Sequence, residues 1–170
     1  GILGPNGCGK TTTIGMILGL LKPSKGEVLI NGISIESNRV ELLNNLNFIS
    51  PYIELPKKLS VQQNLEVYGR LYDVKNLKKK IEELTENLRL NKIINKITGE
   101  LSSGQKNRVS LAKSIINDPT VLLLDEPTAS LDPETGDFIR SFLENYQKEK
   151  GASILLASHN MAEVERLCSY

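Results

Sequence analysis

The chain contains only two cysteines, Cys8 and Cys168, and no long apolar run. Two cysteines are too few for a disulfide framework, and this suits a reducing, cytoplasmic setting. The longest hydrophobic stretches, such as Val121–Leu124, are far too short to cross a bilayer, and we expect no signal peptide. The sequence therefore predicts a soluble protein, and its 170 residues fit one domain.

Strong charge of one sign is also missing. The formal net charge is +1, and acidic and basic residues are interleaved, so no nucleic-acid partner is expected. Internal repeats and low-complexity tracts are absent. The first residue is Gly1, and little of a strand precedes the glycine-rich stretch that follows, so we expect a fragment of a longer chain, truncated at its N-terminus.

The stretch Gly4–Thr12 matches the phosphate-binding pattern G-x-x-x-x-G-K-[ST]. A glycine-rich turn can point successive backbone amides at phosphate oxygens because no Cβ obstructs it. Lys10 adds a positive charge for the β- and γ-phosphates, and Thr11 offers a hydroxyl to Mg²⁺. Cys8 occupies a small-residue place and is expected to pack. We predict that this loop binds a nucleotide through Gly4, Asn6, Gly7, Cys8, Gly9, Lys10, Thr11 and Thr12.

Hydrophobic periodicity predicts an α/β fold in which a mostly parallel sheet is flanked by helices. The expected strands are residues 2–3, 27–30, 33–35, 47–50, 121–124 and 153–157. One helix is expected directly after the phosphate loop, with Leu21 on its buried face. Further helices are expected at about 39–45, 61–72, 77–88, 105–117 and 133–146, and a last helix is expected from residue 160. Residues 60–117 are expected to form a helical insert between α/β portions at about 1–50 and 118–170.

Three short patterns predict local structure. Asn31-Gly32 is a tight-turn signal between two short strands. Ser60 and Gln63 have the spacing of a capping box at a helix start. Asp132 is a favourable N-cap because Pro133 follows it at the first helical position.

Two adjacent carboxylates, Asp125 and Glu126, follow the apolar run Val121–Leu124. Such a run is typical of a strand buried on both faces of a parallel sheet, and ligands bind at the carboxyl ends of such strands. Asp125 fits a metal site shared with Thr11, and Glu126 fits a general base or a water-orienting group. The alternative is that both residues only cap a strand–loop junction. An adjacent pair downstream of a phosphate loop favours the catalytic interpretation.

His159 is the only histidine of the chain. A lone histidine is more often a structural hydrogen-bonding residue than a catalytic one. Here it follows an apolar strand and is expected at the sheet edge where a γ-phosphate could be reached. We therefore predict a catalytic role for His159.

The order of these motifs resembles that of ATP-binding cassette ATPases. The resemblance rests on Gly4–Thr12, on Leu101-Ser102-Ser103-Gly104-Gln105, on Val121–Glu126, on Ser130-Leu131-Asp132 and on Ser158-His159. In family terms these are Walker A, signature, Walker B, D-loop and H-switch. The resemblance covers essentially the whole chain and implies a P-loop NTPase fold, ATP hydrolysis, and ATP and Mg²⁺ as ligands.

The resemblance also implies a head-to-tail dimer with a second nucleotide-binding domain. Each ATP would lie between the Walker A loop of one copy and the signature of the other, and we expect the nucleotide to be contacted from the partner side by Ser102, Ser103, Gly104, Gln105 and Asp132. A serine-led helix N-terminus is an anion site, although the same residues also suit an ordinary helix cap. Both interpretations are compatible.

The resemblance further implies a transmembrane permease subunit or domain as partner and a place on the inner face of the cell membrane. The stretch 160–168 resembles export cassettes, so we expect an exporter. The alternatives are a soluble cassette ATPase acting on the ribosome or on DNA, and a regulatory module without turnover. The presence of both Glu126 and His159 disfavours the regulatory module without turnover.

Two family features are not found in this sequence. The glutamine that normally follows the strand at 47–50 would fall near Pro51 or Tyr52, and neither is glutamine. Tyr52 or Glu54 are candidate substitutes. The aromatic residue that stacks on adenine belongs to a segment before the phosphate loop and is not part of this chain.

Overall fold

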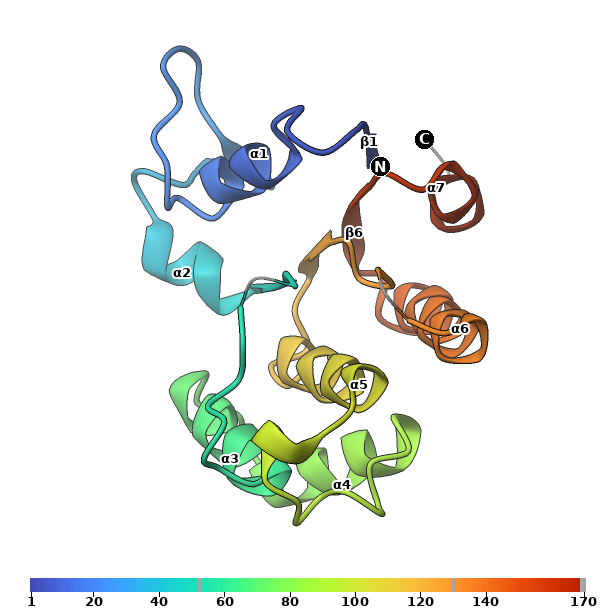
Figure 1. Ribbon diagram of the computed structural model, residues 1–170. Helices are drawn as coiled ribbons and strands as arrows, with labels where there is room; N and C mark the ends of the chain where they lie inside the picture. The colour runs from blue at the N-terminus through green and yellow to red at the C-terminus, as the bar shows by residue number, and fades with distance from the viewer. Residues whose placement is uncertain (52, 130, 169–170) are drawn as a thin grey trace.

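The computed structural model describes residues 1–51, 53–129 and 131–168. Its centre is a parallel sheet in the order β1-β6-β5-β4, with helices on both faces (Figure 1). The strands are β1 (Ile2–Leu3), β4 (Leu46–Ile49), β5 (Val121–Asp125) and β6 (Ser153–Ser158). The predicted α/β class with a parallel sheet is confirmed.

Strand β5 lies inside the sheet, and its successive side chains pack alternately in two hydrophobic cores. Leu123 packs in a cluster with Ile14 and Leu18, from α1 (Lys10–Ile17) and its C-cap. Leu122 and Leu124 belong to the opposite cluster, which includes residues of α5 (Ser103–Ser114) and α6 (Pro133–Lys150). Successive side chains of a strand point to opposite faces of the sheet, so a strand that is covered on both faces needs an unbroken apolar run.

The predicted hairpin is present as β2 (Leu29–Ile30) and β3 (Ile33–Ser34). Its turn residues Asn31 and Gly32 have φ angles of 52° and 78°, which asparagine and glycine tolerate better than other residues. Helix α2 (Arg39–Asn44) leads from the hairpin to β4. The first strand of the hairpin starts at Leu29 and is therefore shorter than the predicted segment 27–30.

The prediction that Leu21 lies on the buried face of the first helix is wrong. Helix α1 ends at Ile17, and Leu21 is 49% exposed. Gly19, with a φ of 64°, turns the chain, and the amides of Leu20 and Leu21 both donate to the carbonyl of Gly15. A glycine in the left-handed region terminates a helix in this way.

The middle of the chain forms α3 (Val61–Leu71), α4 (Leu77–Asn87), the short helix η1 (Thr98–Glu100) and α5. Helices α3, α4 and α5 lie together on one side of the sheet in Figure 1. The predicted capping box of α3 is confirmed, since Ser60 Oγ accepts from the Gln63 amide at 3.1 Å and Gln63 Oε1 accepts from the Ser60 amide at 2.9 Å. The apolar cluster that includes Leu65 and Leu84 continues to Leu122, so these helices share a core with the sheet.

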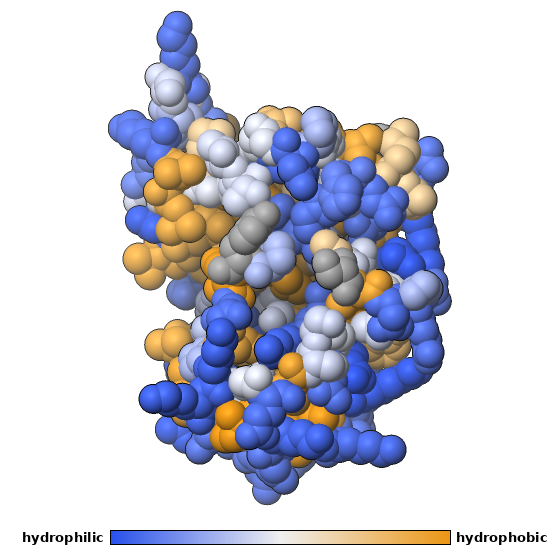
Figure 2. All heavy atoms as spheres, viewed as in Figure 1, coloured by the Kyte–Doolittle hydropathy of each residue, from blue (hydrophilic) through white to orange (hydrophobic). Residues whose placement is uncertain are grey.

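The surface carries exposed apolar side chains in the segment around α1 and α2. Leu20 and Val40 are 63% and 78% exposed, and Leu21 and Leu29 are also exposed. Figure 2 shows hydrophobic atoms gathered on this side of the molecule. Within the described ranges, no helix has both the length and the apolar character needed to cross a membrane.

Candidate functional site

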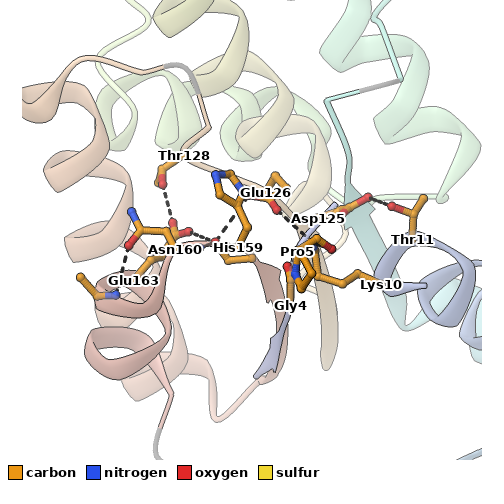
Figure 3. A network of polar contacts seen from close by, with 12 residues as sticks. Gly4, Pro5, Lys10, Thr11, Asp125, Glu126, Thr128, His159, Asn160 and Glu163 are labelled. Carbon is orange, nitrogen blue, oxygen red and sulfur yellow. Dashed lines mark hydrogen bonds and ion pairs between the residues drawn. The ribbon is translucent and has the colours of Figure 1, made fainter. Parts of the chain in front are cut away.

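The loop 4–9 wraps around the side chain of Lys10. Lys10 is 6% exposed, and its Nζ donates to the carbonyl oxygens of Gly4 at 2.7 Å and Pro5 at 3.2 Å (Figure 3). Gly7 and Gly9 have φ angles of 86° and 101°. A Cβ at either position would meet no atom within 4 Å, so it is the backbone conformation that requires glycine there.

Cys8 does not pack as predicted: its side chain is exposed. Its sulfur lies over the loop's first glycine, and a Cβ added to Gly4 would be 2.5 Å from Cys8 Sγ. Gly4 is therefore needed for close approach of the thiol. Asn6, Gly7 and Thr12 are exposed as well.

Thr11 and Asp125 are brought together from distant parts of the sequence. The hydroxyl of Thr11 donates to Asp125 Oδ2 at 2.8 Å, and Asp125 is 1% exposed (Figure 3). Hydroxyl and carboxylate oxygens suit Mg²⁺. No group of three or more His, Cys, Asp or Glu residues that could hold a metal occurs in the described part of the chain. A metal at this pair would therefore take its other ligands from phosphate oxygens and water, as Mg²⁺ commonly does.

Glu126 follows directly and has a φ of 50°, which is unusual for a residue other than glycine. Its amide donates to the carbonyl of Ala157 at 2.9 Å, which holds it against β6. A non-glycine residue in this region costs about 1–3 kcal/mol, and such residues cluster at functional sites. The backbone of Glu126 thus turns out of β5 at the sheet's carboxyl edge.

The two carboxylate oxygens of Glu126 differ. Oε2 lies 2.8 Å from His159 Nδ1, whereas Oε1 lies 3.6 Å from Lys10 Nζ. Oε1 is buried and has no hydrogen-bond donor among the described residues. A buried carboxylate oxygen without a donor is a suitable acceptor for a proton of water.

His159 lies at the place predicted for it. Residues Leu3 and Ser158 are register partners of β1 and β6, and the Gly4 amide donates to the Ser158 carbonyl at 3.3 Å. This pairing puts His159 beside the start of the phosphate loop. Its ring is about half exposed, its Nδ1 faces Glu126, and Nε2 has no hydrogen-bond partner among the described residues.

The segment 102–105 forms a helix cap, as its alternative interpretation predicts. Ser102 Oγ accepts from the Gln105 amide at 3.3 Å, and Gln105 Oε1 accepts from the Ser102 amide at 3.1 Å. Asp132 caps α6 by accepting from the Thr135 amide at 2.9 Å, and this bond holds the pKa of Asp132 below its ordinary value. A Cβ at Gly104 would lie 3.3 Å from Thr135, so the two helix starts are close.

The signature residues and the phosphate loop do not contact each other through polar groups. Within residues 1–51, 53–129 and 131–168, no hydrogen bond or ion pair joins Ser102, Ser103, Gly104, Gln105 or Asp132 to Gly4–Thr12. Ser103 is exposed at the first turn of α5. Among the described residues, the N-terminus of α5 is therefore exposed and makes no polar contact with the phosphate loop of the same copy.

A cavity of about 220 Å³ adjoins Glu126, between the segment after β4 and α5. The expected substitutes for the missing glutamine lie in this segment. Glu54 lines the cavity and forms an ion pair with Lys57 at 2.6 Å, and the hydrogen bond from Lys57 lowers the pKa of Glu54. Tyr52, and Ser130 of the D-loop, lie outside the described residues.

Sequence reasoning missed two charged residues that are buried or partly buried. Glu163 of α7 (Met161–Leu167) is buried and bonded to Ser158 and to Thr128, although a glutamate in a charged helix reads as solvent-exposed. Lys113 of α5 lies over the rings of Phe48 and Tyr68, and burial lowers its pKa to about 8. No local pattern distinguishes these residues from surface charges.

Comparison with known proteins agrees with the site. The family model described as ABC transporter matches residues 1–129. A relative from Bacillus subtilis, the uncharacterized ABC transporter ATP-binding protein YhcH, is 41% identical over 99% of this chain and 55% of its own length. The Nod factor export ATP-binding protein I of Rhizobium johnstonii is 40% identical, over 99% and 54%. The chain thus spans about half the length of the curated relatives it matches.

Two solved structures have the same fold. The ATP-binding cassette MJ0796, in a dimeric post-hydrolysis state bound to ADP and Pi, has a TM-score of 0.85 and 28% identity, covering 97% of this chain and 76% of that one. The cbiO1 protein from Clostridium perfringens, part of the complex cbiONQ, has a TM-score of 0.83 and 34% identity, covering 98% and 69%. The predicted resemblance, the P-loop fold and the nucleotide-binding class are confirmed.

Proposed function

This chain belongs to the ABC transporter family, and on that premise we propose that it binds ATP, hydrolyses it and thereby drives a membrane transporter. The nucleotide is bound by Gly4, Asn6, Gly7, Cys8, Gly9, Lys10, Thr11 and Thr12. In this proposal Glu126 and His159 act in hydrolysis, and Thr11 and Asp125 hold Mg²⁺. Residues at about 1–50 and 118–170 form the ATP-binding core, and about 60–117 act as a helical subdomain.

The observation that carries the proposal is the position of Lys10 relative to Glu126. Lys10 Nζ lies 3.6 Å from Glu126 Oε1, although the two residues come from opposite ends of the matched region. The ammonium group that would meet the γ-phosphate and the carboxylate that would meet the attacking water are therefore neighbours. Phosphoryl transfer depends mainly on such positioning.

Each of these residues has a separate chemical role in the proposal. Glu126 Oε1 accepts a proton from the attacking water, and the bond from His159 to Oε2 fixes the carboxylate. Lys10 compensates negative charge on the phosphates. When bound, Mg²⁺ would neutralise charge between the β- and γ-phosphates. Thr11 and Asp125 fit it because both present oxygen atoms, 2.8 Å apart.

A head-to-tail dimer is the second part of the proposal. Ser102, Ser103, Gly104, Gln105 and Asp132 of one copy would contact ATP held by the phosphate loop of the other. The exposure of Ser103 at the start of α5 supports it, because the positive end of a helix dipole attracts anions. The two nucleotides would then hold the dimer together until hydrolysis.

Solution mass of the Glu126→Gln variant, measured by light scattering with and without Mg-ATP, tests the dimer, and ATP binding and phosphate release by the wild-type protein test the enzymatic part. The amide keeps the volume of the side chain but cannot take up the proton, so ATP would be bound without turnover. We expect the mass to double only with nucleotide. A double variant that adds Ser103→Glu is the control, since a glutamate there favours the helix locally but repels the partner's phosphates.

Each outcome has a distinct meaning. If the control variant binds ATP and stays monomeric, the shared site is supported. If Glu126→Gln binds ATP without any change in mass, the dimer is wrong. If the wild-type protein neither binds nor hydrolyses ATP, the enzymatic proposal itself fails.

We propose a transmembrane permease as the partner and the inner face of the cell membrane as the location. Exposed apolar side chains and the cavity after β4 support an interface with another protein. Export is the proposed direction, supported by the similarity to a Nod factor export ATP-binding protein. Copurification with a membrane-spanning protein, followed by transport assays in vesicles of both orientations, tests the partner and the direction separately.

A further inference from the structure

Glu163 is a buried acidic residue that the proposed chemistry does not use. It is 3% exposed, and it lies in the first turn of α7. Each oxygen of its carboxylate accepts one hydroxyl: Oε1 accepts from Thr128 Oγ1, and Oε2 accepts from Ser158 Oγ at 2.7 Å (Figure 3). A carboxyl group buried this deeply needs hydrogen-bond partners for its oxygens.

These two bonds join three segments that carry the candidate catalytic groups. Thr128 lies in the loop that follows Glu126, and Ser158 immediately precedes His159. Glu163 itself belongs to the helix after His159. The carboxylate therefore links the chain on either side of the Glu126–His159 pair without contacting that pair.

Ser158 has a single hydroxyl proton and two carboxylates within reach. Its Oγ lies 2.7 Å from Glu163 Oε2 and 3.5 Å from Glu126 Oε2. The shorter contact takes the proton, since hydrogen bonds weaken with distance. The Asn160 amide donates to the same Oγ at 3.1 Å and so favours this orientation of the hydroxyl.

We propose that Glu163 is a positioning residue for the Glu126–His159 pair. It holds the Ser158 proton away from Glu126, so that Glu126 Oε2 accepts from His159 alone. Without it, Ser158 would donate to Glu126 Oε2 and loosen the bond from His159, so the carboxylate would lose its fixed orientation. The kinetic part of this inference rests on the proposed ATP hydrolysis, whereas the structural part does not.

The Glu163→Gln variant of the whole chain tests the inference. An amide accepts through one oxygen only, so one of the two hydroxyls must turn away. We expect kcat for ATP to fall at least about tenfold with little change in KM, because a misplaced base affects the reacting geometry more than binding. Glu165→Gln is the matched control, since Glu165 is exposed on the same helix.

A second readout reports on His159 directly. It is the only histidine, so ¹⁵N NMR of the imidazole gives one set of signals and shows which nitrogen carries the proton. We expect the Nδ1–H form in the wild type and in Glu165→Gln, and a shift towards Nε2–H in Glu163→Gln. In a Ser158→Ala background, Glu163→Gln should then have little additional effect on either readout.

The outcomes separate a positioning role from a structural one. A fall in kcat with an unchanged tautomer, repeated in the Ser158→Ala background, would overturn the inference and assign Glu163 to stability alone. Wild-type values of both readouts in Glu163→Gln would overturn it as well. If the wild type does not hydrolyse ATP, the proposed function fails, and the tautomer still decides the position of His159.

Discussion

His159 Nδ1 lies 2.8 Å from Glu126 Oε2. The contact joins the residue after the central strand β5 to the residue after its neighbour β6. Because one oxygen of Glu126 is engaged in this way, the other, which lies 3.6 Å from Lys10 Nζ, is oriented towards the phosphate loop. The pair thus fixes a buried carboxylate at the sheet edge where the loop would hold a nucleotide.

Replacement of His159 by alanine should impair turnover more than binding. The Glu126 carboxylate loses the donor that orients it, so we expect kcat for ATP to fall by about 100-fold while KM stays nearly constant. Steady-state phosphate release measures both. Met161→Ala, an exposed change nearby, is the control and should be neutral. A variant with normal kcat would remove His159 from the catalytic group.

Lys10→Met should weaken nucleotide binding. The substitution keeps an apolar stem of similar length but removes a buried ammonium group that donates to the loop carbonyls. A hydrogen bond to a charged group is worth about 1.5–3 kcal/mol, so we expect the affinity for Mg-ATP to fall about 10- to 100-fold. Isothermal titration calorimetry provides the measurement, with the well-exposed Lys22→Met as the control. Unchanged affinity would contradict the assigned role.

The carboxylate of Asp118 should increase the free energy of unfolding only at pH values above its folded-state pKa. Partial burial raises the pKa of Asp118, but hydrogen bonds from Lys80 and Lys150 outweigh it, and the net pKa lies below the ordinary value of 3.8. The contribution is therefore present above about pH 4 and is lost as pH falls through the folded-state pKa. Asp118→Asn should cost less than about 1 kcal/mol at pH 7, because the carboxylate is partly exposed, and the cost should shrink as the pH falls below about 4.

Urea unfolding at several pH values measures this difference. Asp73→Asn is the matched control, because Asp73 is exposed and also has a left-handed backbone, with a φ of 51° against 46° for Asp118. Asparagine tolerates this conformation, so neither change adds strain. An equal pH dependence in both variants would contradict the role of the lysine contacts.

Lys113 should make the protein more stable as pH rises towards 10. Burial lowers its pKa from 10.5 to about 8, so the unfolded chain binds more protons between these values and the free energy of unfolding increases with pH. Lys113→Met should therefore be stabilising at pH 7, on the order of 1–3 kcal/mol. This gain should shrink between pH 8 and 10.5.

The same unfolding experiment, with exposed Lys148→Met as the control, checks this expectation. Contacts of Nζ with the rings of Phe48 and Tyr68 favour the charged amine and reduce the gain. A stability difference that does not vary with pH would show that Lys113 keeps an ordinary pKa.

Local features of the fold could be predicted from the sequence because neighbouring residues decide them. The Asn31-Gly32 turn, the capping boxes at Ser60 and Ser102, and the cap at Asp132 all depend on groups within about three residues of one another. The burial of β5 on both faces of the sheet could also be predicted, since an unbroken apolar run requires cover on both faces. The prediction for the end of α1 is wrong because Gly19, in the left-handed region, turns the chain there. Cys8 is exposed, contrary to the expectation that it packs.

The sequence by itself determined the candidate groups: the phosphate loop with Lys10, the carboxylates Asp125 and Glu126, and the single histidine. Only the tertiary structure decided which groups meet. The order β1-β6-β5 places the start of the phosphate loop, His159 and Glu126 along one sheet edge, and this order follows from long-range strand pairing. Burial of Glu163 has the same origin, because its two donors come from different loops and no local pattern encodes them.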